Sequence, residues 1–570
     1  MTTHARPLAD WLAAASDEDL ILLLTRRRVR SDVGWHDFFD AAEALLDAAS
    51  LAKVLPSLTR AEAAALLHAT EGHDAGAERE SLIALALLRP DGTPHPPVVA
   101  ALAGRDAPSD RVSVAVSPSP SESEAHAAER AFTTVAILAD LLLIARDTPF
   151  ALLAGGTVSA GEKRQLAETG VPIEIVDPVL GVAVDAGLAI VDERRLRTTA
   201  AAEEWLRSSV AERWSVLVNA FRTSLPRGVR SPDGGWIPVT DWPHAHPWDP
   251  SWPERSALLR DAALLLGIIA EDGTEPSWSV PLRRGLPADP SDLAGLLPAE
   301  VDRIFLQNDL TAIAPGPLAP ALDVRLRTMA ARESTAQASS YRFTADSIAR
   351  AFVAGESAPS ILDFLGEISL TGIPQPLGYL VTQTAARHGL VRVSTDDETG
   401  RTRIESTDPH LIEAMGVDQT LRPLALTRHI DSLTTRVGRD TVYWALTDAR
   451  YPATLVGGDG TALVSARHPA PVVDPTAPTG QTDLVPLISR LRAQQGPDAD
   501  AAWLDRELEA AVRARAVLRV TVGMPDGSTR ELLLEATGIG GGRLRGRDRA
   551  ADVERTLPVS SIRAASIVAS

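Results

Sequence analysis

The sequence predicts a mainly helical α+β protein, in which tandem winged-helix-like modules are followed by a small C-terminal β-barrel of SH3-like size. Aliphatic side chains far outnumber aromatic ones, which make up only 4% of the residues, and this composition favours helical packing. Two stretches each place three helical segments before a pair of short β-prone runs, which is the winged-helix order. The C-terminal residues alternate short strands with tight turns, as small barrels do.

Shifts in proline, glycine and charge divide the 570 residues at three places. These breaks are the polar stretch Ser117–Glu124 (SPSPSESE), the proline-rich stretch Pro226–Pro253, and His468–Gly480 (HPAPVVDPTAPTG), which is the clearest linker. We therefore expect an N-terminal helical domain (residues 1–115), a winged-helix-like domain (125–225), a Trp- and Pro-rich connector with a helical segment (226–299), a second domain with the winged-helix plan (300–467), a linker (468–482) and a barrel domain (483–570). Apolar spacing in the first domain predicts helices around Leu20–Leu24, Ala41–Leu46 and Ala61–Leu67.

The first winged-helix-like stretch lies between the first two breaks. We expect helices over Ala131–Ala145, Ser159–Glu168 and Asp177–Ala186, with Gly187 as the helix C-cap, and strands over Leu188–Val191 and Arg195–Thr198. Arg194, Arg195 and Arg197 of this hairpin could hold phosphates. The third helix has no basic or amide side chain that could contact a base, which favours packing against protein and a scaffold role.

The second stretch repeats the plan and is better equipped for nucleic acid. Its expected helices are Thr344–Phe352, with Thr344 as N-cap, Ala358–Glu367 and Pro374–Arg387, and its expected strands are Leu390–Ser394 and Arg401–Glu405. Amide, imidazole and guanidinium groups suited to bases and phosphates come from Gln375, Gln383, Arg387, His388, Arg401 and Arg403. The acidic turn Asp396, Asp397 and Glu398 would repel a phosphate backbone. DNA contact, a solvated helix face and a protein-binding surface therefore all stay open.

The C-terminal domain shows the one clear contrast of charge. After an expected helix over Ala501–Ala516 come strands over Val517–Val522 and Thr529–Ala536, joined by a turn at Pro525–Gly527, then the glycine run Gly538–Gly542 and a closing segment over Val559–Val568. Residues 501–570 hold 11 Arg against 9 Asp or Glu, a formal +2, which leaves −21 for the rest of the chain. In a strand, alternate arginines share one face, and the row is Arg543, Arg545, Arg547 and Arg549. Such a row would bind phosphate or single-stranded nucleic acid, or protect a sheet edge from aggregation.

Composition excludes several classes of function. The absence of cysteine excludes disulfides, thiolate zinc sites and cysteine nucleophiles, and it suits a reducing, cytoplasmic interior. No apolar run approaches the ~20 residues of a membrane span. The net charge of −19 opposes general DNA binding, so any contact with nucleic acid needs a local patch. The connector's tryptophans could stack bases, although their proline-rich and acidic surroundings favour a packed plug between domains; they are Trp236, Trp242, Trp248, Trp252 and Trp278.

Three phrases carry a family resemblance: Phe305–Leu318 (FLQNDLTAIAPGPL), Tyr341–Ser369 and Gly372–Val393 (GIPQPLGYLVTQTAARHGLVRV). They resemble the helicase-associated domain at the N-terminus of XPB-type repair and transcription helicases, which also occurs in stand-alone actinobacterial proteins. Val184–Trp214 is similar to the corresponding part of those stand-alone proteins. Leu508–Ile562 is similar to the ligand-sensing WYL domain of bacterial regulators, but it lacks the Trp-Tyr-Leu tripeptide, which puts the usual ligand pocket in doubt.

We find no motif for ATP hydrolysis or other catalysis. The nearest phosphate loop runs from Gly156 to Arg164, but Glu162 and Lys163 stand where a working loop needs Lys followed by Ser or Thr. Asp192–Arg194 is an expected turn and does not follow a buried strand as a Mg²⁺-binding carboxylate motif would. His244 and His246 lie in a proline-rich loop without the spacing of metal ligands, so we expect no metal and no cofactor.

The first functional hypothesis is a non-catalytic accessory protein that binds DNA, including forked or single-stranded DNA, or recruits an XPB-like helicase in repair or transcription. A second is a ligand-responsive regulator in which the WYL-like domain senses a ligand. A third is a protein-interaction scaffold that does not bind DNA. The sequence does not indicate an oligomeric state.

Overall fold

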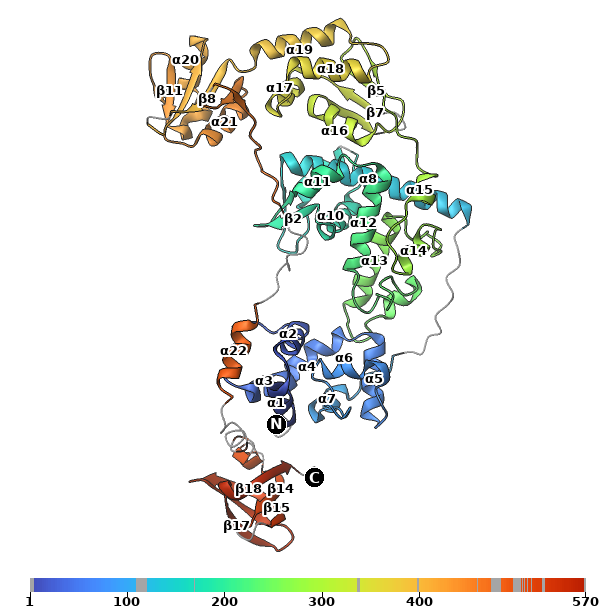
Figure 1. The fold of residues 1–570 in the computed structure, drawn as a ribbon, viewed down its shortest axis with the longest axis vertical. Coiled ribbons are helices and arrows are strands. Elements are labelled where there is room, and N and C mark those ends of the chain that lie inside the picture. The colour runs from blue at the N-terminus through green and yellow to red at the C-terminus, as the bar shows by residue number, and fades with distance from the viewer. Residues whose placement is uncertain are drawn as a thin grey trace.

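A computed structural model describes residues 5–108, 120–168, 170–335, 339–396, 399–458, 460–472, 483–495, 504, 506, 508–509, 511–513, 515–524 and 528–567. The fold is α+β, as the sequence predicts, and the described residues form five hydrophobic cores. In Figure 1 the yellow and orange parts of the chain lie side by side at the top of the view, and the central, N-terminal and C-terminal parts follow below them. In the described part of the chain, no helix combines the length and the apolar character that crossing a bilayer requires.

The N-terminal bundle (residues 5–108) consists of short helices, and all three of its predicted helices are confirmed. Ser16 caps α2 by accepting from the Asp19 amide at 3.1 Å, and Thr59 and Glu62 form a capping box at the start of α5. The bundle contains α1 (Arg6–Ala14), α2 (Asp17–Arg26), α3 (Phe38–Leu46), α4 (Ala48–Val54), η1 (Leu55–Ser57), α5 (Arg60–Thr70), η2 (Gly76–Glu78), α6 (Arg79–Ile83) and α7 (Pro96–Leu102).

The central body (residues 120–297) begins with the first predicted helix–hairpin stretch. Its elements follow the expected order, with a short strand β1 added after the first helix: α8 (Ser121–Asp147), β1 (Phe150–Ala151), α9 (Ala160–Glu168), α10 (Ile173–Asp185), β2 (Ala189–Asp192) and β3 (Arg195–Thr198). The three strands pair in the order β1-β3-β2. Gly187 has a φ of +68° after α10, as expected of the residue that ends this helix.

The predicted polar loop Ser117–Glu124 is wrong from Ser121 onward, because α8 begins there. Pro120 is extended at the N-cap position, and Glu122 and Glu124 lie in the first turn, where carboxylates stabilise the positive end of the helix dipole. Residues 117–119 lie outside the described residues.

The tryptophan-rich stretch shares its core with the helix–hairpin stretch before it. Trp236, Trp242, Trp252 and Trp278 are at most 2% exposed, which confirms that they pack in a core. Their indole N–H groups have acceptors; for example, Trp278 donates to the Gly267 carbonyl at 2.8 Å. The rest of the central body is α11 (Ala200–Trp205), α12 (Val210–Ser224), η3 (Val239–His244), α13 (Trp252–Leu265), α14 (Ser279–Arg283) and α15 (Ser291–Ala294).

Module A (residues 300–388) packs helices on a four-stranded sheet of order β4-β5-β7-β6. The three helices predicted from the second stretch are confirmed here, and Thr344 caps the first by accepting from the Ser347 amide at 3.0 Å. The elements are β4 (Phe305–Leu306), β5 (Thr311–Ala314), α16 (Pro320–Met329), β6 (Ala331–Thr335), β7 (Ser339–Arg342), α17 (Ala345–Val353), α18 (Ala358–Ile368) and α19 (Gln375–Arg387).

Module B (residues 389–467) has its own core and a six-stranded sheet of order β10-β11-β9-β8-β12-β13. The predicted hairpin is present as β8 and β9, but it belongs to this sheet, whereas the three preceding helices belong to module A. All pairs are antiparallel except β8 with β12. The elements are β8 (Val391–Thr395), β9 (Thr402–Ser406), α20 (Pro409–Val417), η4 (Gln419–Leu424), β10 (Thr427–Arg428), β11 (Ser432–Thr435), α21 (Arg439–Asp448), β12 (Ala453–Val456) and β13 (Ala462–Leu463).

The C-terminal sheet (residues 515–567) has five strands in the order β17-β16-β15-β14-β18. The predicted closed barrel is not formed among the described residues, because β17 and β18 lie at opposite edges without pairing. The turn predicted at Pro525–Gly527 lies outside the described residues, as does part of the helix predicted over Ala501–Ala516. The elements are β14 (Val517–Gly523), β15 (Thr529–Gly540), β16 (Arg543–Asp548), β17 (Val553–Pro558), η5 (Val559–Ser561) and β18 (Ile562–Ile567).

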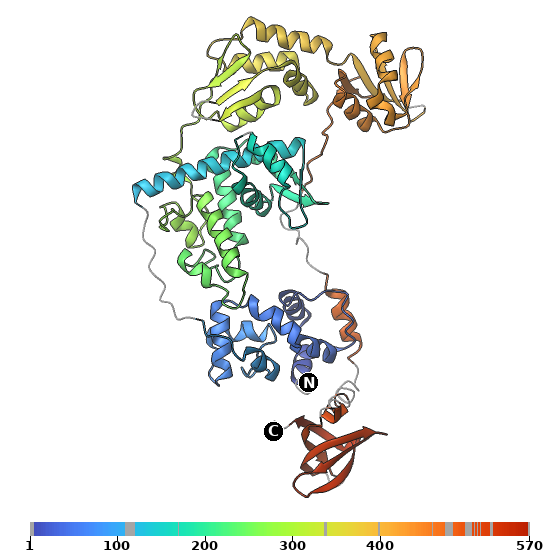
Figure 2. The ribbon, with the colours of Figure 1, turned by 180° about the vertical axis from the view of Figure 1, so that it is seen from behind.

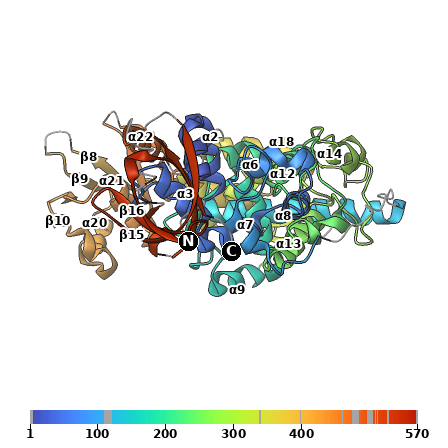
Figure 3. The same ribbon diagram turned by 90° about the horizontal axis from the view of Figure 1, so that it is seen from below.

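Helix α22 (Val485–Ala493) returns the chain to the N-terminal bundle. Leu484, just before this helix, and three of its apolar side chains are part of that bundle's core: Leu487, Ile488 and Leu491. Arg492 donates to the carbonyls of Ala13 and Ala15 at the end of α1. Figure 2 shows the segment after β13 running from module B past the β2–β3 hairpin, and Figure 3 shows α22 beside α2 and α3. Of the predicted linker, residues 473–482 lie outside the described residues.

Candidate nucleic-acid interface

Helix α19 presents a row of polar side chains on the outside of module A. Pro374 is extended at its N-cap, and Leu377 and Val381 are fully buried in the module core. The opposite face carries exposed side chains four residues apart, so that they lie side by side along the helix: Gln375, Tyr379, Gln383 and Arg387. We call these four residues the α19 row.

The chemistry of this face differs from that of the rest of the chain. α19 contains no Asp or Glu, and Arg387 is its only charged residue. No ion pair in the described part of the chain includes Arg387. In a protein of net charge −19, this helix therefore offers amide, aromatic and guanidinium groups without a carboxylate to repel phosphate.

Tyr379 is the member of the row that the sequence interpretation missed. It is 66% exposed, which is unusual for a large aromatic side chain. The signal was present in the sequence, since residues 375, 379, 383 and 387 share the four-residue spacing of one helix face.

His388 does not belong to the row. It is half-buried, and its ring lies 5.1 Å from that of Phe352 on α17. Burial lowers the pKa of His388, because the charged imidazolium loses solvation, so the ring is neutral at physiological pH. His388 packs the end of α19 against α17.

The arginines of the β8–β9 hairpin are not aligned with the α19 row, because they lie on the sheet of module B. Arg403 on β9 pairs with Glu405 at 2.8 Å, and Arg401 precedes that strand and is half-buried. The backbone N–H of Asp396 donates to the Arg401 carbonyl at 2.8 Å and closes the turn. Asp397 and Glu398 at the tip lie outside the described residues.

Two of the three arginines predicted to hold phosphates on the first hairpin bind other groups of the protein. Arg197 on β3 pairs with Asp192 at 3.4 Å and donates to the Pro469 carbonyl at 2.8 Å. Arg194 has a φ of +62° in the turn and donates to the Leu152 carbonyl at 3.3 Å. Arg195 points to solvent. The segment after module B therefore passes over this hairpin and occupies one of its three arginines.

The arginine row of the C-terminal sheet is placed as predicted, except at its end. Burial alternates along β16, so that Arg543, Arg545 and Arg547 share the exposed face, whereas Arg549 follows the strand. Arg547 pairs with Asp552 at 2.7 Å, and Arg549 lies 3.8 Å from Glu535. Arg543 and Arg545 have no ion pair in the described part of the chain, so they form the more available cationic pair.

The two residues that interrupt the phosphate-loop pattern have structural partners. The Glu162 carboxylate accepts from the Ala151 amide at 2.9 Å and from the Ser159 hydroxyl at 3.2 Å. The Lys163 ammonium pairs with Asp177 on α10. Glu162 and Lys163 thereby tie the start of α9 to β1 and α10.

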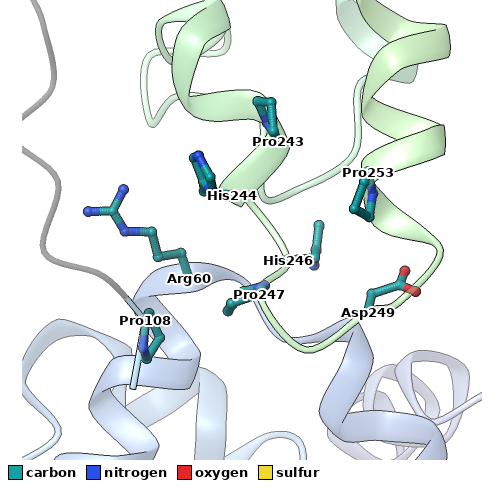
Figure 4. A pocket seen from close by; sticks show the side chains of 8 residues that line it. All are labelled: Arg60, Pro108, Pro243, His244, His246, Pro247, Asp249 and Pro253. Carbon is teal, nitrogen blue, oxygen red and sulfur yellow. The ribbon is translucent and has the colours of Figure 1, made fainter. Parts of the chain in front are cut away.

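A cavity of about 170 Å³ lies between the N-terminal bundle and the central body, and Figure 4 shows its lining. His246 donates from Nδ1 to the Leu58 carbonyl at 2.9 Å and meets Trp252 edge to face. Its pKa is lowered, mainly by burial. Among the described residues, no three His, Asp or Glu side chains group at a metal-binding distance.

Comparison with known protein families places part of the chain in a described family. Residues 304–430 match the family described as the helicase conserved C-terminal domain. The match covers module A from β4 onward and the first part of module B, and it includes the whole α19 row. No curated protein matches the chain significantly. This region of the chain is therefore helicase-related.

Proposed function

We propose that this chain is a non-catalytic, DNA-associated accessory protein related to XPB-type helicases and acting in repair or transcription. The observation that carries the proposal is the α19 row, an exposed, carboxylate-free set of amide, aromatic and guanidinium side chains inside the helicase-related region. Glutamine amides and arginine guanidinium groups are the side chains that contact base edges and phosphates.

The order of elements supports a winged-helix origin for the first helix–hairpin stretch, and the second keeps the same order although its hairpin packs in module B and its helices pack in module A. In the central body, three helices precede the β2–β3 hairpin; in modules A and B, α17, α18 and α19 precede the β8–β9 hairpin. The better-equipped third helix is α19, because α10 carries no basic or amide side chain on its face.

Two observations support a role without nucleotide hydrolysis. Glu162 and Lys163, at the positions where a phosphate loop needs Lys and a hydroxyl, are held by Ala151 and Asp177. In modules A and B, the described strand pairs are antiparallel except β8 with β12, whereas nucleotide-binding lobes place their phosphate loop at the end of a buried parallel strand.

The C-terminal sheet offers a second contact for nucleic acid. Its strand order is compatible with an SH3-like ancestor, in keeping with the WYL-like sequence, and Arg543 and Arg545 project from its exposed face. A ligand-responsive regulator would bind its ligand mainly through this sheet. An accessory protein would bind DNA mainly through the α19 row.

The test is a fluorescence anisotropy titration of the full chain with labelled forked, single-stranded and duplex DNA, between about 50 and 200 mM salt. We expect at least one DNA form to bind and the affinity to fall steeply with salt. Arg387→Ala should lower the slope of log affinity against log salt by about 0.7 to 0.9, the value of one phosphate contact. Arg260→Ala, which removes an exposed arginine from α13 in the central body, is the matched control and should leave the slope unchanged.

Three outcomes would count against the proposal. Undetectable binding of every DNA form at low salt would favour a protein-interaction scaffold. Loss of binding in the Arg543→Ala/Arg545→Ala double variant, with Arg387→Ala unaffected, would favour the regulator. ATP hydrolysis stimulated by DNA would refute the non-catalytic assignment. Point variants are preferable to truncation before residue 483, because α22 belongs to the core of the N-terminal bundle.

A further inference from the structure

Tyr379 lies on the exposed face of α19, and most of its side chain is open to solvent. Its side chain is 66% exposed, with Gln375 one turn before it and Gln383 one turn after it. Removing an aromatic side chain from water is favourable, so an exposed ring between two amides, with a guanidinium two turns further along the helix, is a surface that a planar ligand would cover.

Gly378, the residue before Tyr379, has no packing reason to be glycine. Glycine inside a helix is costly compared with alanine, yet a Cβ at position 378 would meet nothing within 4 Å. Gly378 lies on the outer part of α19, and the Thr382 hydroxyl on the next turn donates back to the Gly378 carbonyl at 2.9 Å. Consecutive residues of a helix point about 100° apart, so glycine at this position lets a ligand approach the helix backbone at the flank of the face that carries Tyr379.

The spacing of the row favours an extended strand over a duplex. Neighbouring members are four residues apart, which is about 6 Å along a helix. Stacked bases in a duplex are only about 3.4 Å apart, and their faces are covered by the neighbouring bases. An unstacked single strand exposes its base faces and can match the wider spacing.

We propose that the exposed face of α19 is a binding site for single-stranded DNA, in which one base stacks on Tyr379. Gln375 and Gln383 contact the edges of the stacked base and its neighbours, and Arg387 contacts a backbone phosphate. Charge complementarity supports this occupant, because the only charge on the helix is positive and has no ion-pair partner in the described part of the chain. This inference rests on the proposed function and specifies its substrate.

The experiment compares the full chain with Tyr379→Ala, Tyr379→Phe and Gly378→Ala in titrations with labelled oligo(dT) and with a duplex of equal length. Loss of one stacked base weakens binding about tenfold, so Tyr379→Ala should bind oligo(dT) about tenfold less tightly, and Tyr379→Phe should retain the affinity. Gly378→Ala should raise the melting temperature and still weaken oligo(dT) binding. Duplex affinity should change much less in all three variants.

The outcomes separate this inference from the proposed function. If the chain binds DNA but Tyr379→Ala affects oligo(dT) and duplex equally or not at all, the stacking site is refuted and DNA association stands. If Gly378→Ala leaves oligo(dT) affinity unchanged, close approach to the helix backbone is refuted. If neither oligo(dT) nor duplex binds at low salt, both the inference and the proposed function are refuted. Equal melting temperatures of the wild type and Tyr379→Ala confirm that the fold is intact.

Discussion

At the scale of single residues, one buried carboxylate joins two bodies. Glu62 on α5 is fully buried, and it accepts from Arg26 of the N-terminal bundle at 3.2 Å and from Arg227 of the central body at 2.5 Å. Burial opposes its ionisation, but hydrogen bonds from Ser81, Thr59 and Arg227 outweigh burial and lower the pKa of Glu62. The ionised form therefore stabilises the folded protein.

The pH dependence of stability follows from the direction of that shift. Because the folded pKa of Glu62 is lowered, its contribution is complete above the ordinary glutamate pKa of 4.5 and is lost as the pH falls through the folded value. Glu62→Gln should lower the unfolding free energy at pH 7 by about 2 kcal/mol, less than for a fully buried pair because the Arg227 side chain is half exposed. Denaturant unfolding between pH 3 and 7 measures this, with the exposed Glu80→Gln as control. A variant as stable as the wild type at pH 7 would contradict the role of Glu62.

Residue by residue, the sequence was informative where local rules apply. Gln375, Gln383 and Arg387 could be placed on one helix face because the four-residue spacing is local. The burial of His388 could not be predicted, because it depends on Phe352 from another helix. The same holds for Arg197, whose acceptor Pro469 lies in a segment distant in sequence.

At the scale of elements, α22 shows that the order of segments along the chain does not predict which segments pack together. The domain division predicted from the sequence assigns these residues to the C-terminal barrel domain (residues 483–570) and predicts no helix over them. Local apolar spacing does not indicate which body a segment will contact. The structure places it on the N-terminal bundle, where Arg492 lies over the Phe38 ring at 5.2 Å, and Arg506, further along, pairs with Asp40 at 2.9 Å. By contrast, α17 to α19 follow from apolar periodicity and the Thr344 cap, and these helices were predicted to within a few residues.

The docking of α22 predicts a defect in a distant part of the sequence. Ile488 is 2% exposed within the core of the N-terminal bundle, and truncating a buried Ile to Ala costs about 2 to 5 kcal/mol. Ile488→Ala should therefore accelerate amide hydrogen exchange in α2 and α3, although those helices are unchanged in sequence. Val485→Ala, at a position 56% exposed on the same helix, should not. Unchanged exchange in Ile488→Ala would refute the docking.

At the scale of the whole molecule, contacts link successive parts of the chain and lead back to the N-terminal bundle. The N-terminal bundle joins the central body through Glu62 and Arg227, and the central body joins module A through Asp140. The segment after module B returns over the first hairpin, where the Ala200 amide donates to the Pro471 carbonyl at 3.1 Å, and α22 then completes the N-terminal bundle. The arrangement holds module A, which carries α19, at one end of the molecule (Figure 1).

Asp140 on α8 is the charge that holds module A to the central body. Its carboxylate pairs with Arg327 of α16 at 2.6 Å and with Arg332 of β6, and all three side chains are largely buried. Asp140→Ala removes the carboxylate that Arg327 and Arg332 share and leaves Arg327 only Asp323, at 3.7 Å. The contact between module A and the central body should weaken by about 2 kcal/mol or more. We expect an increased radius of gyration in small-angle X-ray scattering. Asp147→Ala at the exposed end of α8 is the control, and equal radii in the two variants would contradict this account.

The most direct test of the central claim, that this molecule binds DNA through the exposed face of α19, is photochemical cross-linking. The full chain is irradiated with iodouracil-substituted single-stranded DNA at low salt, and the cross-linked peptides are identified by mass spectrometry. We predict that the main cross-link lies within Gln375–Arg387, at Tyr379, and that Tyr379→Ala abolishes it. Cross-links confined to the C-terminal sheet or to the first hairpin, or no cross-link at all, would contradict the claim.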